Sequence, residues 1–483
     1  MSAPEILSAS VAPETSEPKP KVLIAGAGIG GLTLALLLHK ANVPFLVLER
    51  ATEIKPLGAA FVLGPSVASL LSQLGIYDEF VAMGKPQMKM NILDENLKLQ
   101  FANDFSHIKD VAGTGYYSFS RPDLHQLLWR HLPRENIHLG KKIVNYDDDS
   151  EGVLVRCADG SSYRGHILVG ADGAYSAVRH HMFKAIKAKR PLPVSDDVAP
   201  PFGCVCLVGQ TEVLDPEDFP RLKSETCDAN SVLGVKNMCT WITLTTKANT
   251  VCWMVIRFLD KESSKDDQSF RIDEWGPEAT EAMCKEVRTF KVPGGKDDKV
   301  LTIGDYIDRT PKDLISKVML EEKVYETWSS GRAVLLGDAC HKMNPCGAAG
   351  AVTAMHDAAA LANWISTLKF PSMTDLDQVF KEYRAERYPV AKEAFETSQM
   401  FTKMAGKSLT AVLVRASMKH VPAFLWRRIL ISMSASRPQV SFLPLVEDKG
   451  EVKPLHQPSL HKTLSLAKKQ AFDDAFDNAV TVI

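Results

Sequence analysis

Three absences narrow what this chain of 483 residues can be. Its nine cysteines include no Cys-x-x-Cys pair, so neither a paired zinc-binding framework nor a disulfide scaffold is indicated. No run reaches the roughly 18 consecutive apolar residues expected of a transmembrane helix. The net charge is only −1, which argues against nucleic acid as a partner. We therefore expect reduced thiols and an intracellular location, cytoplasmic or peripheral to a membrane.

The remaining composition is that of a globular protein with more than one domain. Hydrophobic residues make up 45% and charged residues 24% of the chain, both ordinary fractions. A chain of this length can form two or three hydrophobic cores. Residues 1–20, rich in Ser, Pro and Glu, lack an apolar core of signal-peptide length, and we expect them to form a disordered tail.

The most informative segment is a predicted strand–helix–strand unit. Residues 21–25 are predicted to form a buried strand, residues 32–38 a helix and residues 43–48 a second strand. Between the first strand and the helix stands the sequence Gly26-Ala27-Gly28-Ile29-Gly30-Gly31. A G-x-G-x-x-G turn in this context is typical of dinucleotide-binding sites.

Each part of this turn has a physical role. Gly26 permits the tight turn, Gly28 lets a pyrophosphate approach the backbone, and Gly31 lets the helix pack close to the strand. The helix N-terminus offers free N–H groups to the phosphates. Glu49, at the end of the second strand, can accept hydrogen bonds from ribose hydroxyls and disfavours a 2′-phosphate, so this site suits FAD or NAD.

Three further segments carry polar groups at predicted strand or helix ends. Arg121 begins a helix after Ser120, and Asp172 follows a predicted buried strand. Asp338 also ends a predicted strand, and a Pro/Gly/Ala-rich loop at 345–351 leads from there into a helix. An aspartate at a strand end can hold a ribityl hydroxyl, and the helix N-terminus can face a flavin carbonyl.

These segments, in this order and at these distances, resemble the flavoprotein monooxygenases of the para-hydroxybenzoate hydroxylase fold. The chain looks most like the fungal FAD-dependent monooxygenases of meroterpenoid and indole-diterpene pathways and their salicylate-hydroxylase-like relatives. The most specific stretch is 322–345. The resemblance implies an α/β fold, with a Rossmann-like FAD-binding domain, an interleaved β-rich substrate domain and a helical C-terminus. We assign residues 21–196 and 321–375 to the first, 197–320 to the second and 376–483 to the third.

The resemblance also implies which residues contact the cofactor. Val62 matches a backbone contact to the flavin, and Arg121 matches an arginine that reaches the ribityl-diphosphate region. Asp172 matches an Asp-Gly motif associated with FAD and NAD(P)H, and Asp338 and Ala351 match contacts to the ribityl chain and the isoalloxazine edge. The predicted cofactor-binding residues are therefore Gly26, Gly28, Gly31, Glu49, Val62, Arg121, Asp172, Asp338 and Ala351. No catalytic side chain and no metal site is assigned.

The loop at 345–352 departs from the family pattern, which usually reads Pro-x-x-Gly-Gln-Gly-Gly/Ala-Asn. Here Ala348 replaces a glycine, Ala349 a glutamine and Val352 an asparagine. Backbone contacts to a flavin survive an alanine if φ is negative, but side-chain contacts are lost. The altered loop leaves open a non-catalytic flavin-binding protein as one alternative to an enzyme.

The function implied is that of an FAD-dependent monooxygenase of secondary metabolism. NAD(P)H would bind transiently and reduce the flavin, and O₂ would add at C4a to form a hydroperoxide. The oxygen would hydroxylate or epoxidise an electron-rich small molecule, phenolic or prenylated and terpenoid in kind. The nearest alternative enzyme is a flavin reductase of the same fold that acts on an alkene.

Other residues allow more than one interpretation. His341 is expected to bond the loop backbone rather than a metal, and Trp241 and Trp253 either face a substrate pocket or pack in a core. Tyr383 and Arg387 match a family pattern that suggests a structural brace.

The segment 397–446 holds seven Lys or Arg and no acidic residue, among many apolar ones. Within it, Arg415, Lys419, Arg427, Arg428 and Arg437 are expected to lack an acid that offsets their charge. This pattern predicts either contact with a membrane surface, or entry for a lipophilic substrate, or a helical cap on the FAD-binding domain.

Overall fold

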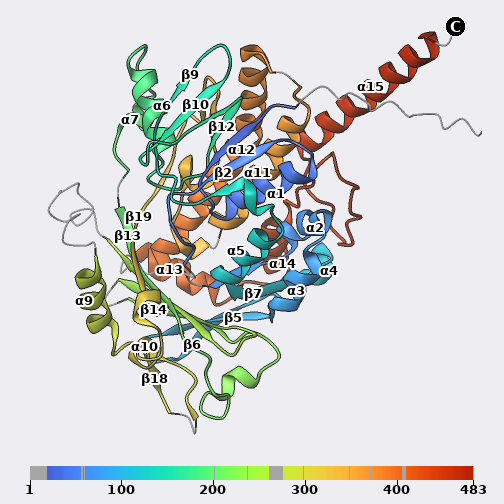
Figure 1. The fold of residues 1–483 in the computed structure, drawn as a ribbon. Coiled ribbons are helices and arrows are strands. Elements are labelled where there is room, and N and C mark those ends of the chain that lie inside the picture. Colours follow the sequence, from blue (N-terminus) through green and yellow to red (C-terminus); the bar gives the residue numbers. More distant parts are fainter. Residues whose placement is uncertain are drawn as a thin grey trace, which may run out of the picture.

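A computed structural model describes residues 19–481, apart from 56–57, 59, 201, 236–237, 260–275, 297–298, 348, 370 and 405–408. Its central element is a six-stranded sheet in the order β21-β22-β12-β1-β2-β8 (Figure 1). The strands are β1 (Val22–Ala25), β2 (Phe45–Leu48), β8 (Ile137–His138), β12 (Ile167–Gly170), β21 (Ser329–Ser330) and β22 (Ala333–Leu335). The mixed α/β fold with an FAD-domain sheet agrees with the prediction.

The register of this sheet brings three distant turns to one edge. Ala25 pairs with Gly170, and Gly170 pairs with Leu335, all in parallel strands. Because parallel strands end at the same edge, the residues that follow β1, β12 and β22 lie side by side. Ligands of open α/β sheets bind at this carboxyl edge.

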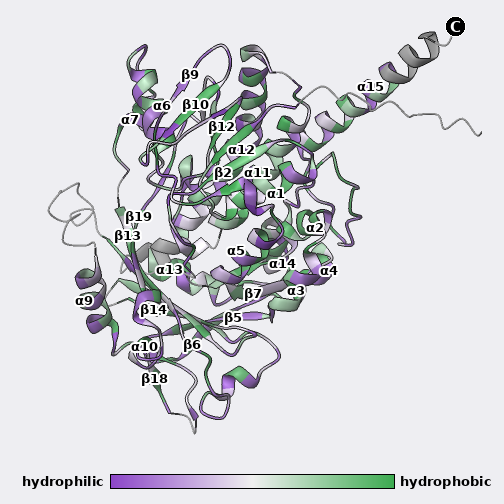
Figure 2. Cartoon of the chain, viewed as in Figure 1, coloured by the Kyte–Doolittle hydropathy of each residue, from purple (hydrophilic) through white to green (hydrophobic). Residues whose placement is uncertain are grey.

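Two helices with little polar surface lie against the sheet. α1 (Ile29–Lys40) is buried from Ile29 to Leu38, and α11 (Gly350–Ser366) is buried from Thr353 to Ile365. The two helices contact each other, and α12 (Met373–Met404) packs on α11. Hydrophobic residues concentrate around this centre, whereas α9 (Pro277–Val287) at the periphery shows hydrophilic and hydrophobic stretches together (Figure 2). A helix that is apolar on all sides belongs in a core.

The second sheet has seven strands in the order β19-β13-β16-β15-β14-β5-β6. They are β5 (Lys89–Asp94), β6 (Leu99–Asp104), β13 (Phe202–Gln210), β14 (Ala229–Gly234), β15 (Cys239–Thr245), β16 (Val251–Phe258) and β19 (Ser316–Glu321). β5 and β6 come from the segment that we assigned to the FAD-binding domain. The second sheet thus combines strands from both assigned segments. The domain boundaries given above stay a prediction.

The two faces of this second sheet have different neighbours. One face forms a core with α9 and α10 (Ile303–Ile307). On the other face, Ala60 and Val62 of β3 (Ala60–Leu63) pack against Ala229 and Leu244. β3 thus joins the second sheet to the FAD-binding part of the chain.

Trp241 and Trp253 lie on the face that packs against α9 and α10. The Nε1 of Trp253 donates to Thr310 Oγ1 at 3.0 Å, and the Nε1 of Trp241 donates to the Lys291 carbonyl at 2.8 Å. Trp253 has 0% exposed surface. Of the two interpretations of these tryptophans, core packing is correct and the pocket is wrong.

The C-terminal part is helical, as expected. After α12 come α13 (Leu409–Met418), α14 (Ala423–Ser434) and α15 (Pro458–Thr481). α15 projects away from the rest of the molecule (Figure 1). Among the described residues, no helix combines the length and the apolar character that a membrane span requires.

We predict that Trp253→Ala lowers the free energy of unfolding by about 3–5 kcal/mol, because it leaves a cavity at a buried site and removes the hydrogen bond to Thr310. Urea unfolding measures this loss. Val213→Ala, at an exposed position, is the control and should change stability by less than about 0.5 kcal/mol. Equal stability of the two variants would contradict the core position of Trp253.

Candidate functional site

Two glycines of the first turn are required by the fold itself. Gly26 has φ +102°, and a Cβ there would lie 2.5 Å from the Ala171 carbonyl oxygen. A Cβ at Gly31 would lie 2.2 Å from the Gly26 carbonyl oxygen. Both distances are far below normal contact, so any side chain would push the turn, β12 or α1 out of place.

Gly28 is different, because the described protein gives no steric reason for a glycine there. Its φ is −75°, and a Cβ would meet no atom within 4 Å. Gly28 is the N-cap of α1 and forms no side-chain cap, so the first N–H groups of the helix are available to a ligand. Open space beside an uncapped helix N-terminus fits a diphosphate.

Glu49 holds the glycine turn from one side. Its carboxylate accepts hydrogen bonds from the Ala27 and Ala51 N–H groups, both at 2.8 Å. A carboxylate has about four acceptor positions, so Glu49 can also accept from ribose hydroxyls.

His125 holds the same turn from the other side, and sequence reasoning missed it. Its Nε2 lies 2.8 Å from the Ala27 carbonyl oxygen, and burial lowers the pKa of the imidazole. A neutral ring with its proton on Nε2 donates this bond. The sequence did offer one signal: His125 lies four residues after Arg121, so the two side chains share one face of the same helix.

Arg121 begins α5 (Arg121–Arg130), whose N-cap Ser120 accepts from the Asp123 N–H at 3.3 Å. Burial lowers the pKa of the Arg121 guanidinium, and the nearby Asp338 carboxylate raises it. The charge of Asp338 therefore acts on Arg121 although the two come from distant segments. Gly58, with φ +127°, leaves room for the arginine stem: a Cβ there would lie 2.6 Å from Arg121 Cδ.

Val62 and Ala351 lie at two other boundaries of this region. Val62 pairs with Ser118 of β7 (Tyr116–Ser120), the strand that leads into Arg121. Ala351 is in the first turn of α11 and packs partly buried on the core. Ala349, the N-cap of α11, has φ −95°, which an alanine adopts without strain. Ala348 lies outside the described residues.

Asp172 follows β12 and supports the start of α6 (Ala177–Lys187). Its Oδ2 accepts from the Val178 N–H at 3.2 Å, and burial raises the pKa of the carboxyl. Its Oδ1 is buried with no hydrogen-bond partner among the described residues. A buried acceptor without a donor fits a hydroxyl supplied by a ligand.

Arg179 ties two of the turns together. Its side chain is 2% exposed, and it donates to the Ala174 carbonyl at 2.6 Å and to the Ala339 carbonyl at 2.8 Å. The guanidinium also lies 4.4 Å from the centre of the Tyr325 ring. The turn after β12 is thereby fastened to the turn that carries Asp338.

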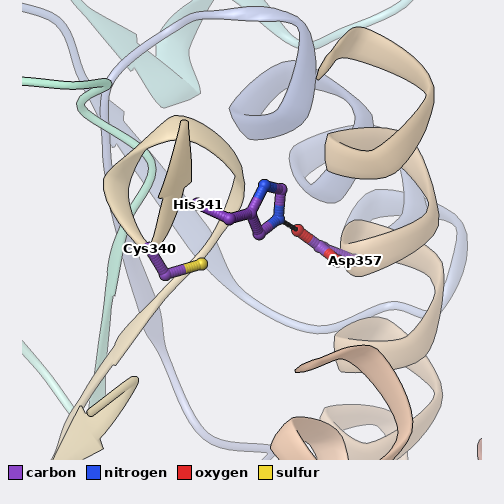
Figure 3. A group of neighbouring side chains, drawn as sticks. All are labelled: Cys340, His341 and Asp357. Carbon is purple, nitrogen blue, oxygen red and sulfur yellow. Dashed lines mark hydrogen bonds and ion pairs between the residues drawn. The ribbon is translucent and has the colours of Figure 1, made fainter. Parts of the chain in front are cut away.

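Asp357 of α11 holds the turn that carries Asp338 through hydrogen bonds. Its Oδ2 accepts from the Gly337 N–H at 3.1 Å and from His341 Nε2 at 2.6 Å (Figure 3). Its Oδ1 accepts from Arg387 Nε at 2.8 Å. These cationic and polar donors outweigh burial and lower the pKa of Asp357 to about 2.

Two predictions are tested by this network. The expectation that His341 bonds the loop backbone is wrong, because its partner is the Asp357 carboxylate, which lies on the adjacent helix. Tyr383 and Arg387 do act as a brace: the Tyr383 hydroxyl donates to the Leu335 carbonyl at 3.1 Å, and Arg387 binds Asp357.

Cys340, His341 and Asp357 together lie close enough to be considered as metal ligands, but their chemistry does not fit a cation. The Arg387 guanidinium already compensates the carboxylate. Burial raises the pKa of the Cys340 thiol well above its usual value, and Sγ lies 3.4 Å from the Gly337 carbonyl. A protonated thiol is not a good metal ligand.

The chain between Asp338 and α11 is also fastened to α12. Asn344 is buried, and its Nδ2 donates to the Ser398 carbonyl at 3.2 Å. Burial raises the pKa of Glu322, while hydrogen bonds with Asn344 and Gln399 lower it. The region around the sheet edge is therefore held by contacts from α6, α11 and α12.

Comparison with known proteins agrees with this geometry. The family model described as FAD binding domain matches residues 19–195 and 301–398. The FAD-dependent monooxygenase paxM of Penicillium paxilli is 30% identical over 397 residues, which cover 79% of this chain and 78% of that protein. The FAD-dependent monooxygenase nvfK of Aspergillus novofumigatus is 30% identical over 396 residues, or 80% of each chain.

Solved structures share the fold. HpxO of Klebsiella pneumoniae, complexed with FAD and uric acid, has a TM-score of 0.63 at 21% identity and covers 86% of this chain and 96% of its own. PqsL of P. aeruginosa, in complex with 2-aminobenzoylacetate, has a TM-score of 0.60 at 20% identity and covers 83% and 98%. The matching family model and the two relatives of 30% identity show that the protein is an FAD-binding oxidoreductase. The chain belongs to the family of FAD-dependent monooxygenases.

We predict that Gly28→Val folds but loses FAD affinity by at least about tenfold, because the side chain would fill the space for the diphosphate. Flavin absorbance and titration with FAD measure this loss. Gly115→Val is the matched control, since a Cβ there also meets nothing within 4 Å. Wild-type affinity in Gly28→Val would remove the glycine turn from the FAD site.

We predict that Asp357→Asn costs about 3–5 kcal/mol of stability at neutral pH, because Arg387 would keep a buried charge without its partner. The ionised Asp357 stabilises the fold above its ordinary pKa of about 3.9, and this contribution is lost as the pH falls toward about 2. The difference in unfolding midpoint between Asp357→Asn and wild type should therefore narrow progressively between about pH 4 and about pH 2.

The control for this variant is Asp377→Asn, since Asp377 forms only an exposed ion pair with Lys381. That change should cost less than about 1 kcal/mol. A stability gap between Asp357→Asn and wild type that stays constant as the pH falls would contradict the network.

Proposed function

We propose that this FAD-dependent monooxygenase uses NAD(P)H and O₂ to hydroxylate or epoxidise an electron-rich, largely apolar small molecule. One observation supports this most: three turns from distant segments meet at one sheet edge, beside open space at an uncapped helix N-terminus. When bound there, FAD would supply the redox chemistry by which O₂ is activated.

Different residues of the chain would bind different parts of FAD. Gly28 and the N-terminus of α1 would bind the diphosphate, and Glu49 the adenosine ribose. Arg121 would add a cation near the diphosphate, with Asp338 on the ribityl side. The N-terminus of α11, near Ala351, would face the flavin carbonyls where negative charge develops.

The substrate would lie against the second sheet, on the face opposite Trp253. This face carries partly exposed apolar side chains, among them Met238, Ile242, Met254 and Leu320. Such a wall binds a phenolic, prenylated or terpenoid molecule and excludes water from the reacting atoms. These apolar side chains favour an apolar substrate over an anionic one.

The nicotinamide would bind transiently rather than at a site of its own. The chain has one G-x-G-x-x-G sequence at a strand–helix turn, and Glu49 makes that turn suited to FAD. NAD(P)H would therefore reduce the flavin and leave. The described cysteines are free thiols, which supports our proposal of an intracellular location.

The test is oxidation of NADPH and NADH by the FAD-loaded protein across a panel of phenolic and prenylated compounds under ¹⁸O₂. We expect a substrate that stimulates NAD(P)H oxidation and a product that carries one ¹⁸O atom. Hydrogenation of an alkene without ¹⁸O would instead indicate the flavin reductase. FAD binding without any stimulated oxidation would indicate the non-catalytic alternative.

A further inference from the structure

The helices α13 and α14 expose an unusual number of large apolar side chains. Leu413 is 69% and Phe424 is 65% exposed. The exposed apolar residues of the two helices are Val412, Leu413, Phe424, Leu425, Ile429 and Met433. Clustered apolar exposure of this kind marks an interaction surface.

α14 has two distinct faces. On the inner face, Leu430 and Ser434 are buried, and the Trp426 indole N–H donates to the Asp104 carbonyl. This face packs on α2 (Pro65–Leu74) and α4 (Ile108–Ala112). The helical cap that we considered is therefore present, but it uses only half of the helix.

The outer face of α14 forms one continuous stripe. With 3.6 residues per turn, the small exposed Ser432 and five larger side chains share this side of the helix; the five are Phe424, Leu425, Arg428, Ile429 and Met433. We call these five residues the α14 stripe. Arg428 lies within it, exposed and flanked by apolar side chains.

The charges of this region differ from the prediction. Arg437 is buried and binds Asp448 at 2.6 Å, and Arg427 binds Glu451 at 2.7 Å. The expectation that these two cations lack acidic partners is wrong, because the partners lie just beyond residue 446. Arg428 and Lys419 are exposed and form no ion pair with any residue that the structure describes. The outer face of α14 is thus apolar and carries one positive charge, that of Arg428, while Lys419 lies just before the helix.

We propose that the α14 stripe docks this protein on an anionic lipid surface. A helix of twelve residues is too short to cross a bilayer, but it can lie in the headgroup region with its apolar side inward. Arg428 has a long stem that can pass among apolar chains while its guanidinium binds lipid phosphate. α14 itself carries no acidic side chain to oppose this approach.

A lipid surface fits these observations better than a second protein chain. A protein partner would have to bury the Arg428 charge within an apolar contact, which is costly without a counter-charge. Lipid headgroups supply negative charge and leave the guanidinium hydrated. This docking is independent of the oxygenation chemistry, although it would place the protein where apolar substrates accumulate.

The experiment is flotation of the full-length FAD-loaded protein with two kinds of vesicle, phosphatidylcholine alone and phosphatidylcholine with phosphatidylserine. We expect roughly tenfold tighter binding to the anionic vesicles, with the difference lost at high salt. Phe424→Asp with Ile429→Asp should abolish binding, and Arg428→Glu should remove the preference for anionic lipid. FAD content and thermal unfolding would confirm that the variants fold.

The matched control is Leu99→Asp with Val213→Asp, two exposed apolar positions of the second sheet region. This control should bind vesicles as wild type does. Equal binding to both vesicles, or unchanged binding of Phe424→Asp with Ile429→Asp, would overturn the proposal. A concentration-dependent dimer that Phe424→Asp disperses, without vesicle binding, would assign the stripe to a second copy instead. None of these vesicle-binding or dimerisation results depends on the outcome of the ¹⁸O experiment, so the two proposals can fail separately.

Discussion

The arrangement of the cofactor region depends on one buried carboxylate. Asp357 has 0% exposed surface and is surrounded by donors from the Gly337 turn, from His341 and from Arg387. A buried charge is costly unless it is fully compensated, so the position of Asp357 dictates the positions of its partners. Through Gly337 the carboxylate sets the turn that carries Asp338, and through Arg387 it sets α12, which in turn holds the loop at Asn344.

Side chains from neighbouring elements also fix the other turns at the carboxyl edge of the central sheet. Arg179 joins the second and third turns, while Glu49 and His125 hold the first from two sides. The backbone groups that would meet FAD are thus fixed before it binds, which lowers the entropic cost of binding. The second sheet contributes an apolar face, and α14 adds exposed apolar side chains on the outside of the molecule.

Local features of the site could be predicted from the sequence, and non-local ones could not. The glycine turn, Glu49 and the strand ends depend on neighbours within one strand–helix–strand unit, so their pattern is visible in the chain. Asp357 bonds residues 16, 20 and 30 positions away, on three different elements, and no local period reveals this. The two tryptophans alternate with apolar residues on both sides, so the sequence alone did not indicate which face was the core. The charge count within 397–446 missed Asp448 and Glu451 because these acidic partners lie outside that segment and reach Arg437 and Arg427 only in the folded chain.

The strand order of the central sheet has a consequence for biosynthesis. β22 pairs with β12 and thereby completes an edge whose first strand begins at Val22. A ribosome therefore releases β1, α1 and β2 long before the partners that complete the edge exist, and Arg387 follows later still. The nascent chain carries an unfinished nucleotide site through most of its synthesis. At the proposed site, FAD would therefore be inserted only into the late or finished chain, and a product truncated before Arg387 would lack the group that balances Asp357.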